Sequence, residues 1–154
     1  MSERIQVIIA AALMAAIVLW LQFYQLETKS LLEQFDFNAP VLWVEPWRII
    51  SAHILHLDSQ HAISNAIGLL LPTLFFVRHF NVRTWLNAFV IIAASTSILV
   101  WLWGAPERFV GLSGIIHGLF VTGILLDWES QQYRLSQWLL PTALALLVGK
   151  VVLE

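Results

Sequence analysis

The sequence predicts an all-α membrane protein, a helical bundle that crosses the bilayer several times. Hydrophobic residues make up 59% of the 154-residue chain and charged residues only 12%, about half the charged share of a soluble domain. Long runs without Asp, Glu, Lys or Arg recur along the chain. Several of the eight tryptophans lie near the ends of these runs, where amphipathic rings favour the lipid headgroup region.

The same composition excludes several classes of function. A net charge of −2 produces no field that would attract nucleic acid. The absence of cysteine excludes disulfides, thiolate metal sites and a cysteine nucleophile. We expect the lipid bilayer as a partner, no nucleic-acid partner and no cofactor.

The charge-free runs define the expected helices. About 20 apolar helical residues cross a hydrocarbon core, and without water to bind the backbone such segments form helices. We expect five transmembrane helices in one domain spanning residues 1–154. The first is expected to be a permanent anchor, because it is too long and lacks the cleavage-site flank of a signal peptide. The expected helices cover about residues 5–25, 59–77, 84–104, 112–127 and 135–153.

The first loop, residues 26–58, is long for a structureless connection. It contains amphipathic material, including Phe37, Leu42 and Trp43, that is suited to the membrane interface. An ordinary extramembrane loop is the alternative interpretation.

Arginines in the short connections predict the orientation. Arg78 and Arg83 flank the connection between the second and third helices, and Arg134 lies between the fourth and fifth. Short loops rich in Lys and Arg stay in the cytoplasm. We therefore expect a cytoplasmic N-terminus, with the first loop and the connection before Gly111 on the outer side.

The first polar cluster lies at the start of the second helix. His61 and Asn65 are four residues apart, so a helix places them on one face. His53 and His56 have HxxH spacing, which raises the alternative of a metal site. A zinc protease of this kind needs HExxH with a Glu as base, and no acid lies between these histidines. We expect no metal.

The second cluster is the stretch GLSGIIHG, residues 111–118. Gly114 and Gly118 have the GxxxG spacing that lets two membrane helices approach closely, and with this interpretation Ser113 is incidental. Alternatively, Ser113 is a nucleophile at the start of a helix. Backbone N–H groups there have no helical partner and can stabilise an oxyanion.

Together the two clusters resemble the rhomboid family of intramembrane serine proteases. The family pattern has a Trp-Arg pair in the first loop, HxxxxHxxxN at the second helix and GxSG at the start of the fourth. The sequence has all three in this order, as Trp47-Arg48, His56 to Asn65 and Gly111 to Gly114. The resemblance implies a core of six transmembrane helices, five of which are expected in this sequence.

The resemblance also implies a role for each matching residue. Ser113 is similar to the family's nucleophile, and His61 and Asn65 match the side chains that form the oxyanion hole with the Ser113 backbone N–H. His117 occupies a position four residues after the nucleophile, where the family often has an aromatic residue that stacks on the catalytic histidine. Supporting positions are Trp47, Arg48, His56, Gly111, Gly114, His117 and Gly118.

The motif GLSGIIHG and the short N-terminus are similar to the rhombosortase subgroup, which implies substrates with C-terminal Gly-Gly sorting tails. The function implied is that of an intramembrane serine endopeptidase of a bacterial inner membrane. It would open to the periplasm and cleave transmembrane or C-terminal tail segments of membrane-anchored exported proteins.

The expected base is missing from the motifs. The family takes it from a histidine on the sixth helix, and no histidine follows His117 in this sequence. His117 itself, one turn from Ser113 on the same helix, is poorly placed to take its proton. One interpretation is that the native protein continues past Glu154 into a sixth helix, so that the 154-residue chain alone is inactive or impaired. The other is a non-catalytic relative that binds transmembrane clients. With the first interpretation, we expect the glycine stripe of the fourth helix to face the sixth.

Overall fold

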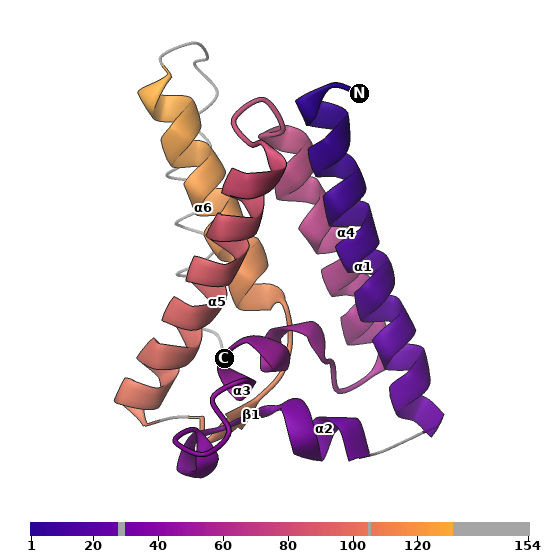
Figure 1. Ribbon diagram of the computed structural model, residues 1–154, viewed down its shortest axis with the longest axis vertical. Helices are drawn as coiled ribbons and strands as arrows, with labels where there is room; N and C mark the ends of the chain where they lie inside the picture. Colours follow the sequence, from indigo (N-terminus) through magenta and orange to yellow (C-terminus); the bar gives the residue numbers. More distant parts are fainter. Residues whose placement is uncertain (28–29, 105, 131–154) are drawn as a thin grey trace.

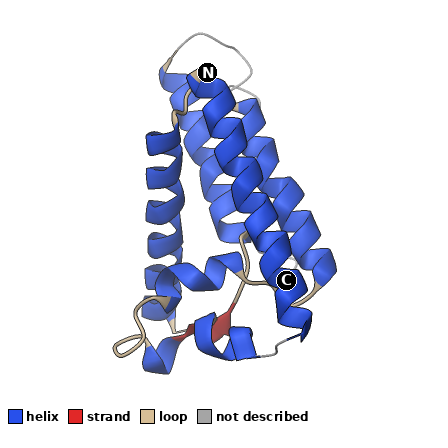
Figure 2. Cartoon of the chain, turned by 45° about the vertical axis from the view of Figure 1, so that its right-hand side comes forward, coloured by secondary structure: helices blue, strands red, loops and turns tan. Residues whose placement is uncertain are grey.

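The computed structural model describes residues 1–27, 30–104 and 106–130. The long helices run along the longest axis of the structure, and short elements gather at one end, opposite the N-terminus (Figure 1). The described chain is mostly helical, as the composition predicts (Figure 2). The long helices are α1 (Glu3–Glu27), α4 (Ser59–Phe75), α5 (Val82–Trp103) and α6 (Ser113–Glu129).

Two of these helices carry the clearest signature of membrane spans. Within the described ranges, the segments Glu3–Leu26 and Val82–Trp103 are long and apolar enough to cross a bilayer by length and composition. Helices α4 and α6 have 17 residues each, at the short end of the roughly 17–25 that a span requires. The expected helix 135–153 lies outside the described residues. Of the five expected spans, two are therefore supported by length and composition.

The first loop contains several short elements. These are α2 (Ser30–Phe35), β1 (Phe37–Asn38), the 3-10 turn η1 (Ala39–Val41), α3 (Arg48–Ser51) and the 3-10 turn η2 (Ala52–Ile54). Strand β1 pairs antiparallel with β2 (Arg108–Phe109), which lies just before α6. The Phe37 and Phe109 rings stack with centroids 4.5 Å apart. The first loop is thereby fixed to the segment that leads into Ser113.

The helices approach one another through small side chains. Helix α1 buries Val7, Ala11 and Val18 along one stripe, and it packs most extensively against α4, which buries Ala62 and Ala66. Lipid tails are as apolar as these side chains, so close van der Waals contact stabilises such pairs inside a membrane. The other faces of α1 and α5 expose large apolar side chains, as is expected for surfaces that lipid covers.

The glycine stripe of α6 packs against α5. A Cβ added at Gly118 would collide with the Ile92 side chain, and one added at Gly114 would lie 3.2 Å from Thr96 Cγ2. The GxxxG spacing therefore does allow close helix approach, but its neighbour among the described residues is α5. The expectation that this stripe faces a sixth helix is wrong at these two glycines, because the side chains of Ile92 and Thr96 of α5 already occupy the space next to their Cα atoms.

The end of the bundle opposite the first loop has its own polar contacts. Asp127, near the end of α6, is 1% exposed and accepts hydrogen bonds from Arg78 and His79 in the α4–α5 connection. Asn81 and Thr84 form a reciprocal capping box that begins α5, and such a cap satisfies backbone donors at a helix start. These contacts fix the α4–α5 connection to α6, far from Ser113.

Candidate active site

The candidate site lies where the starts of α4 and α6 meet the first loop. Ser113 is the first residue of α6. His61 lies in the first turn of α4, where its backbone N–H donates to the Asp58 carboxylate at 2.8 Å. Asn65 follows one turn later and is buried. The fold thus brings the two sequence clusters to the same end of the bundle.

Gly111 is the point of contact between the clusters. A Cβ built on Gly111 would lie 2.9 Å from His61 Cε1 and 3.6 Å from Asn65 Nδ2, so the imidazole and the amide both lie against its backbone. Its backbone φ of 124° is one that residues other than glycine rarely adopt. The Gly111 N–H donates to the carbonyl of Ala52 at 3.0 Å. This segment is therefore held between α4 and the first loop, two residues before Ser113.

Several hydrogen-bond donors at this site have no partner among the described residues. The Asn65 Nδ2 is buried and makes no hydrogen bond within the described part of the chain, although an unpaired buried amide is unfavourable by about 1–3 kcal/mol. The His61 ring likewise makes none there. The Ser113 N–H lies at a helix start, where backbone donors have no intrahelical partner. Donors in this state can bind an oxyanion without first losing another partner.

His56 supports the same segment from the first loop. Its Nε2 accepts a long hydrogen bond of 3.5 Å from the Leu112 N–H, and its ring meets the His61 ring edge-on with centroids 4.9 Å apart. Burial and the neighbouring His61 lower the pKa of His56 to about 4. The imidazole is therefore neutral near pH 7, which leaves Nε2 free to accept. The side chain of Gln25 in α1 donates to the His56 carbonyl at 2.8 Å.

His53 and His56 do not converge on a common point. The His53 Nε2 lies 3.0 Å from both the Ala93 carbonyl and the Ser97 hydroxyl of α5, whereas His56 contacts Leu112 and His61. No three His, Asp or Glu side chains within residues 1–27, 30–104 and 106–130 are grouped so that they could hold a metal ion. The HxxH pair therefore joins the first loop to two different helices.

The comparisons with known proteins agree with the motif pattern. The family model of the Rhomboid domain matches residues 44–153. The chain belongs to the rhomboid family. Rhomboid-family members are membrane proteins, typically serine proteases that act on membrane protein substrates within the bilayer, and the family includes pseudoproteases. Searches of curated proteins and of solved structures find no match.

In this rhomboid, the Trp-Arg pair organises the first loop. Arg48 is buried and binds the Asp36 carboxylate at 2.6 Å, the Glu45 carboxylate and the Glu33 carbonyl. The Trp47 indole donates to the Gln34 carbonyl at 3.2 Å.

Asp36 and Arg108 are residues that the sequence reasoning missed. The second oxygen of the buried Asp36 carboxylate binds Arg108, with N–O distances of 2.6 and 2.7 Å, and Arg108 lies in the strand before Gly111. A signal was present, because a buried arginine requires a carboxylate. The sequence alone did not indicate which of the nearby acids supplies it.

None of the five histidines in the rhomboid sequence makes a hydrogen bond to the Ser113 hydroxyl in the described part of the structure. The Ser113 hydroxyl makes no hydrogen bond within the described residues. His117 Nδ1 lies 2.6 Å from the Ser113 carbonyl, and a carbonyl only accepts, so this nitrogen carries the proton and cannot take another. His79 binds Asp127 at the far end of the bundle. His53 and His56 are turned to the partners described above.

Proposed function

We propose that this rhomboid is an intramembrane serine endopeptidase with Ser113 as its nucleophile. The observation that carries the proposal is the packing of His61 and Asn65 against Gly111, together with the unpaired Asn65 amide. Two polar side chains from one helix meet a glycine that lies two residues before a serine at the start of another helix. An oxyanion hole needs the same combination of nearby donors and space.

The chemistry follows from this arrangement. The Ser113 Oγ attacks the carbonyl carbon of the scissile peptide bond while a base takes its proton. The carbonyl oxygen becomes an oxyanion, and the donors proposed to bind it are the His61 ring, the Asn65 amide and the Ser113 N–H. The base then protonates the leaving amine, and water hydrolyses the acyl-enzyme. Each oxyanion donor of this kind contributes about 10²–10³ in rate.

We propose that the base is a histidine other than the five in these 154 residues. A serine hydroxyl is a weak nucleophile until a base takes its proton, and His117 Nδ1 already donates to the Ser113 carbonyl. In this arrangement His117 is a neighbour of the catalytic histidine, as the resemblance implies. Without that histidine, the 154-residue chain is expected to be inactive or impaired.

The proposed substrate is a membrane-anchored exported protein, cleaved in its transmembrane segment or C-terminal tail. The rhombosortase-like motif GLSGIIHG supports a Gly-Gly sorting tail as the sequence cleaved. The proposed location is a bacterial inner membrane, with the N-terminus in the cytoplasm and Ser113 near the periplasmic face. The arginine distribution and the position of the site opposite the N-terminus (Figure 1) support this orientation.

A fluorophosphonate probe in membranes tests the proposal. The protein is expressed from its complete gene, beside the chain that ends at Glu154 and the Ser113→Ala variant of each. We expect labelling of the complete gene product that Ser113→Ala abolishes, and little or no labelling of the 154-residue chain. Equal labelling of both wild-type proteins would mean that one of the five histidines is the base after all.

A non-catalytic function is the second candidate. It is favoured by the Ser113 hydroxyl, which has no hydrogen-bond partner within the described residues. Such a protein would bind transmembrane clients without cleaving them. The variants His61→Ala and Asn65→Ala separate the two functions: client processing collapses in a protease, whereas client capture without turnover persists in a binding protein.

A further inference from the structure

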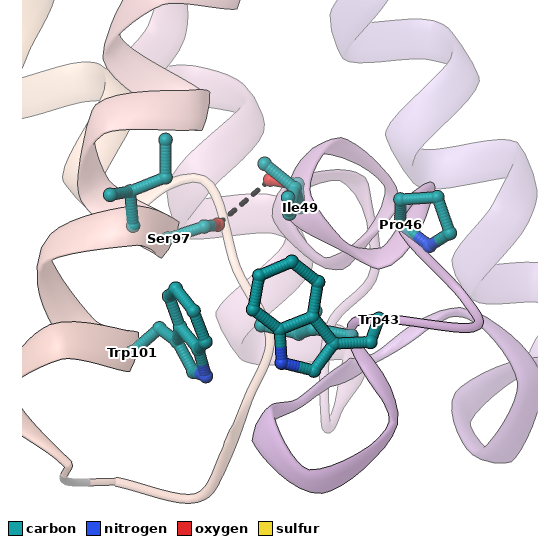
Figure 3. Close-up of a pocket in the computed structure, with 7 residues that line it drawn as sticks. Trp43, Pro46, Ile49, Ser97 and Trp101 are labelled. Carbon is teal, nitrogen blue, oxygen red and sulfur yellow. Dashed lines mark hydrogen bonds between the residues drawn. The ribbon is translucent and has the colours of Figure 1, made fainter.

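A cavity away from Ser113 opens between the first loop and α5. It has a volume of about 190 Å³, somewhat larger than the roughly 150 Å³ of a dry apolar cavity that holds benzene. Figure 3 shows the loop side chains on one side and the α5 side chains on the other. The loop contributes Leu42, Trp43 and Ile49, and α5 contributes Ser97, Ile98 and Trp101.

The interior of this cavity accepts only an apolar occupant. Its one hydroxyl, on Ser97, donates to the Ile49 carbonyl at 2.8 Å and lies 3.0 Å from His53 Nε2. Figure 3 shows the first of these bonds as a dashed line. With this hydroxyl already paired on both sides, the remaining lining is hydrocarbon and aromatic.

The mouth of the cavity is continuous with the lipid-facing surface of α5. Ile98 at the rim is 44% exposed, and its neighbours Leu99 and Leu102 are 65% and 70% exposed. Helix α5 also has the length and composition of a membrane span. In a membrane protein this surface is covered by lipid tails, so the group nearest to the opening is an acyl chain.

Two tryptophans define the polar side of the mouth. The Trp43 and Trp101 rings meet edge-on with centroids 5.2 Å apart. Their indole N–H groups make no hydrogen bond to the described part of the chain, and both nitrogens lie on the side of the ring away from Ser97 (Figure 3). Tryptophan takes this amphipathic position at the boundary between hydrocarbon and headgroups, where the ester oxygens of a lipid accept hydrogen bonds.

We propose that this cavity binds one acyl chain of a phospholipid, with the lipid's ester region at Trp43 and Trp101. A protein helix is about 10–12 Å across, so it can place no more than a side chain in this volume, whereas an acyl chain is narrow enough to enter. The occupant contacts Ile49 and Ser97. The Ser97 hydroxyl lies 3.0 Å from His53 Nε2. The adjacent residue, Ala52, accepts the Gly111 N–H. The acyl chain therefore lies against the same part of the first loop that holds the protein segment before Ser113. This inference does not depend on proteolytic activity.

Photochemical labelling tests the proposal on the full 154-residue chain. The protein is reconstituted in phosphatidylcholine vesicles that contain an increasing fraction of phosphatidylcholine with a diazirine in the middle of one acyl chain. After irradiation, labelled positions are identified by mass spectrometry. We expect labelling of Trp43, Ile98 and Trp101 that saturates as the probe fraction rises, whereas labelling of Leu102 and Trp103 rises in proportion to it.

Two variants provide a matched comparison. Ile98→Trp fills the mouth, and Leu99→Trp adds the same ring at the next, lipid-facing position. Labelling of the cavity should fall several-fold in the first variant and stay unchanged in the second. The proposal is overturned if wild-type labelling of the cavity rises in proportion like that of Leu102, which means only general lipid contact. It is also overturned if cavity labelling falls as protein density rises, which means that a second copy covers this face. The wild-type saturation curve decides the question even if Ile98→Trp does not fold.

Discussion

At Gly111 two requirements coincide: a backbone φ of 124° and a His61 ring that leaves no room for a Cβ. Either alone would favour glycine. Together they mean that any larger residue has to displace the imidazole as well as strain the backbone. Gly104 provides a natural comparison, because its φ is also positive, at 80°, but apart from its two chain neighbours no described residue has an atom within 4 Å of its Cβ position.

These two glycines give the first prediction. Both Gly111→Ala and Gly104→Ala are expected to destabilise the protein by about 1–3 kcal/mol through backbone strain, measured as thermal unfolding in detergent. Only Gly111→Ala is expected to lower fluorophosphonate labelling of Ser113 in the complete gene product as well, because it moves His61. Equal effects of the two variants on labelling would contradict the proposed role of this contact.

The second prediction concerns His56 and pH. Its pKa is about 4 in the folded protein, below the ordinary histidine value of 6.5 that applies to the unfolded chain. The unfolded chain therefore takes up a proton at a higher pH than the folded one. Stability should fall by about 3 kcal/mol as the pH falls from 6.5 to 4 and level off below 4. Burial also lowers the pKa of His53, which adds to the same slope. The free energy of unfolding, measured by chemical unfolding between pH 4 and 7.5, should therefore depend less steeply on pH in His56→Asn than in the wild type. An unchanged dependence on pH would contradict this assignment.

Residue spacing was enough to group His61 with Asn65, because four residues make one turn of a helix. The contact of both with Gly111 could be anticipated only from the family resemblance, since no local pattern links residues fifty positions apart. Neither residue spacing nor the family resemblance could identify the partners of Arg48. Several acids lie near it in sequence, and the choice of Asp36 depends on a two-residue strand pairing that leaves no periodic signal.

At the scale of the elements, Asp36 connects the first loop to strand β2 through its ion pairs. Its side chain is 8% exposed and binds two arginines, of which Arg48 is 5% exposed and Arg108 is 54% exposed. The two ion pairs therefore differ in how much they contribute to the stability of the fold. A buried charge that loses its partner is strongly destabilising, whereas an exposed pair contributes little.

This contrast is the third prediction. Asp36→Asn leaves Arg48 buried with Glu45 as its remaining carboxylate partner, and we expect a loss of about 3 kcal/mol, the lower end for breaking a buried pair. Arg108→Gln should cost no more than about 1 kcal/mol. Denaturant titrations in detergent micelles compare the two variants. A larger loss of stability for Arg108→Gln would mean that the exposed ion pair, between Asp36 and Arg108, contributes more than the buried one.

The fourth prediction concerns the packing of α6 on α5. Gly118→Ala adds a methyl group that collides with Ile92, and overpacking of this kind costs about 1–3 kcal/mol. In the double variant with Ile92→Ala the cost should largely disappear, because the colliding atoms have been removed. Gly114→Ala, whose methyl group meets Thr96 Cγ2 at 3.2 Å, should cost less. A double variant as unstable as the sum of the two single ones would mean that α5 and α6 do not meet at this position.

The elements differed in how far the sequence determined them. The absence of charge marked the long helices, because burial in lipid excludes charge along an entire segment. The 26–58 loop lacks such a constraint, and its short elements depend on contacts with β2 and α5 made far along the chain. The GxxxG motif indicated close packing correctly but not the partner, since small residues permit the approach of any helix.

For the whole molecule, the N-terminus and the connection before α6 lie at opposite ends of the bundle (Figure 1). The chain has no cysteine, so a single introduced cysteine is a unique label. This gives the fifth prediction. A membrane-impermeant maleimide added to intact bacteria whose outer membrane has been permeabilised should label Glu107→Cys but not Ser2→Cys. In inverted inner-membrane vesicles the result should be reversed. Labelling of both positions from one side would contradict the proposed span of the bundle across the membrane.

The position of Asp36 also has a consequence for the order of assembly. Its pairing with Arg48 joins residues 12 apart and can form once the first loop has been synthesised. Its pairing with Arg108 spans 72 residues and has to wait until α4 and α5 have both been laid down. Contacts so distant in sequence form late, because a longer loop has to close. The segment that leads to Ser113 is therefore bound to the Asp36 carboxylate only after the α4–α5 hairpin has been synthesised.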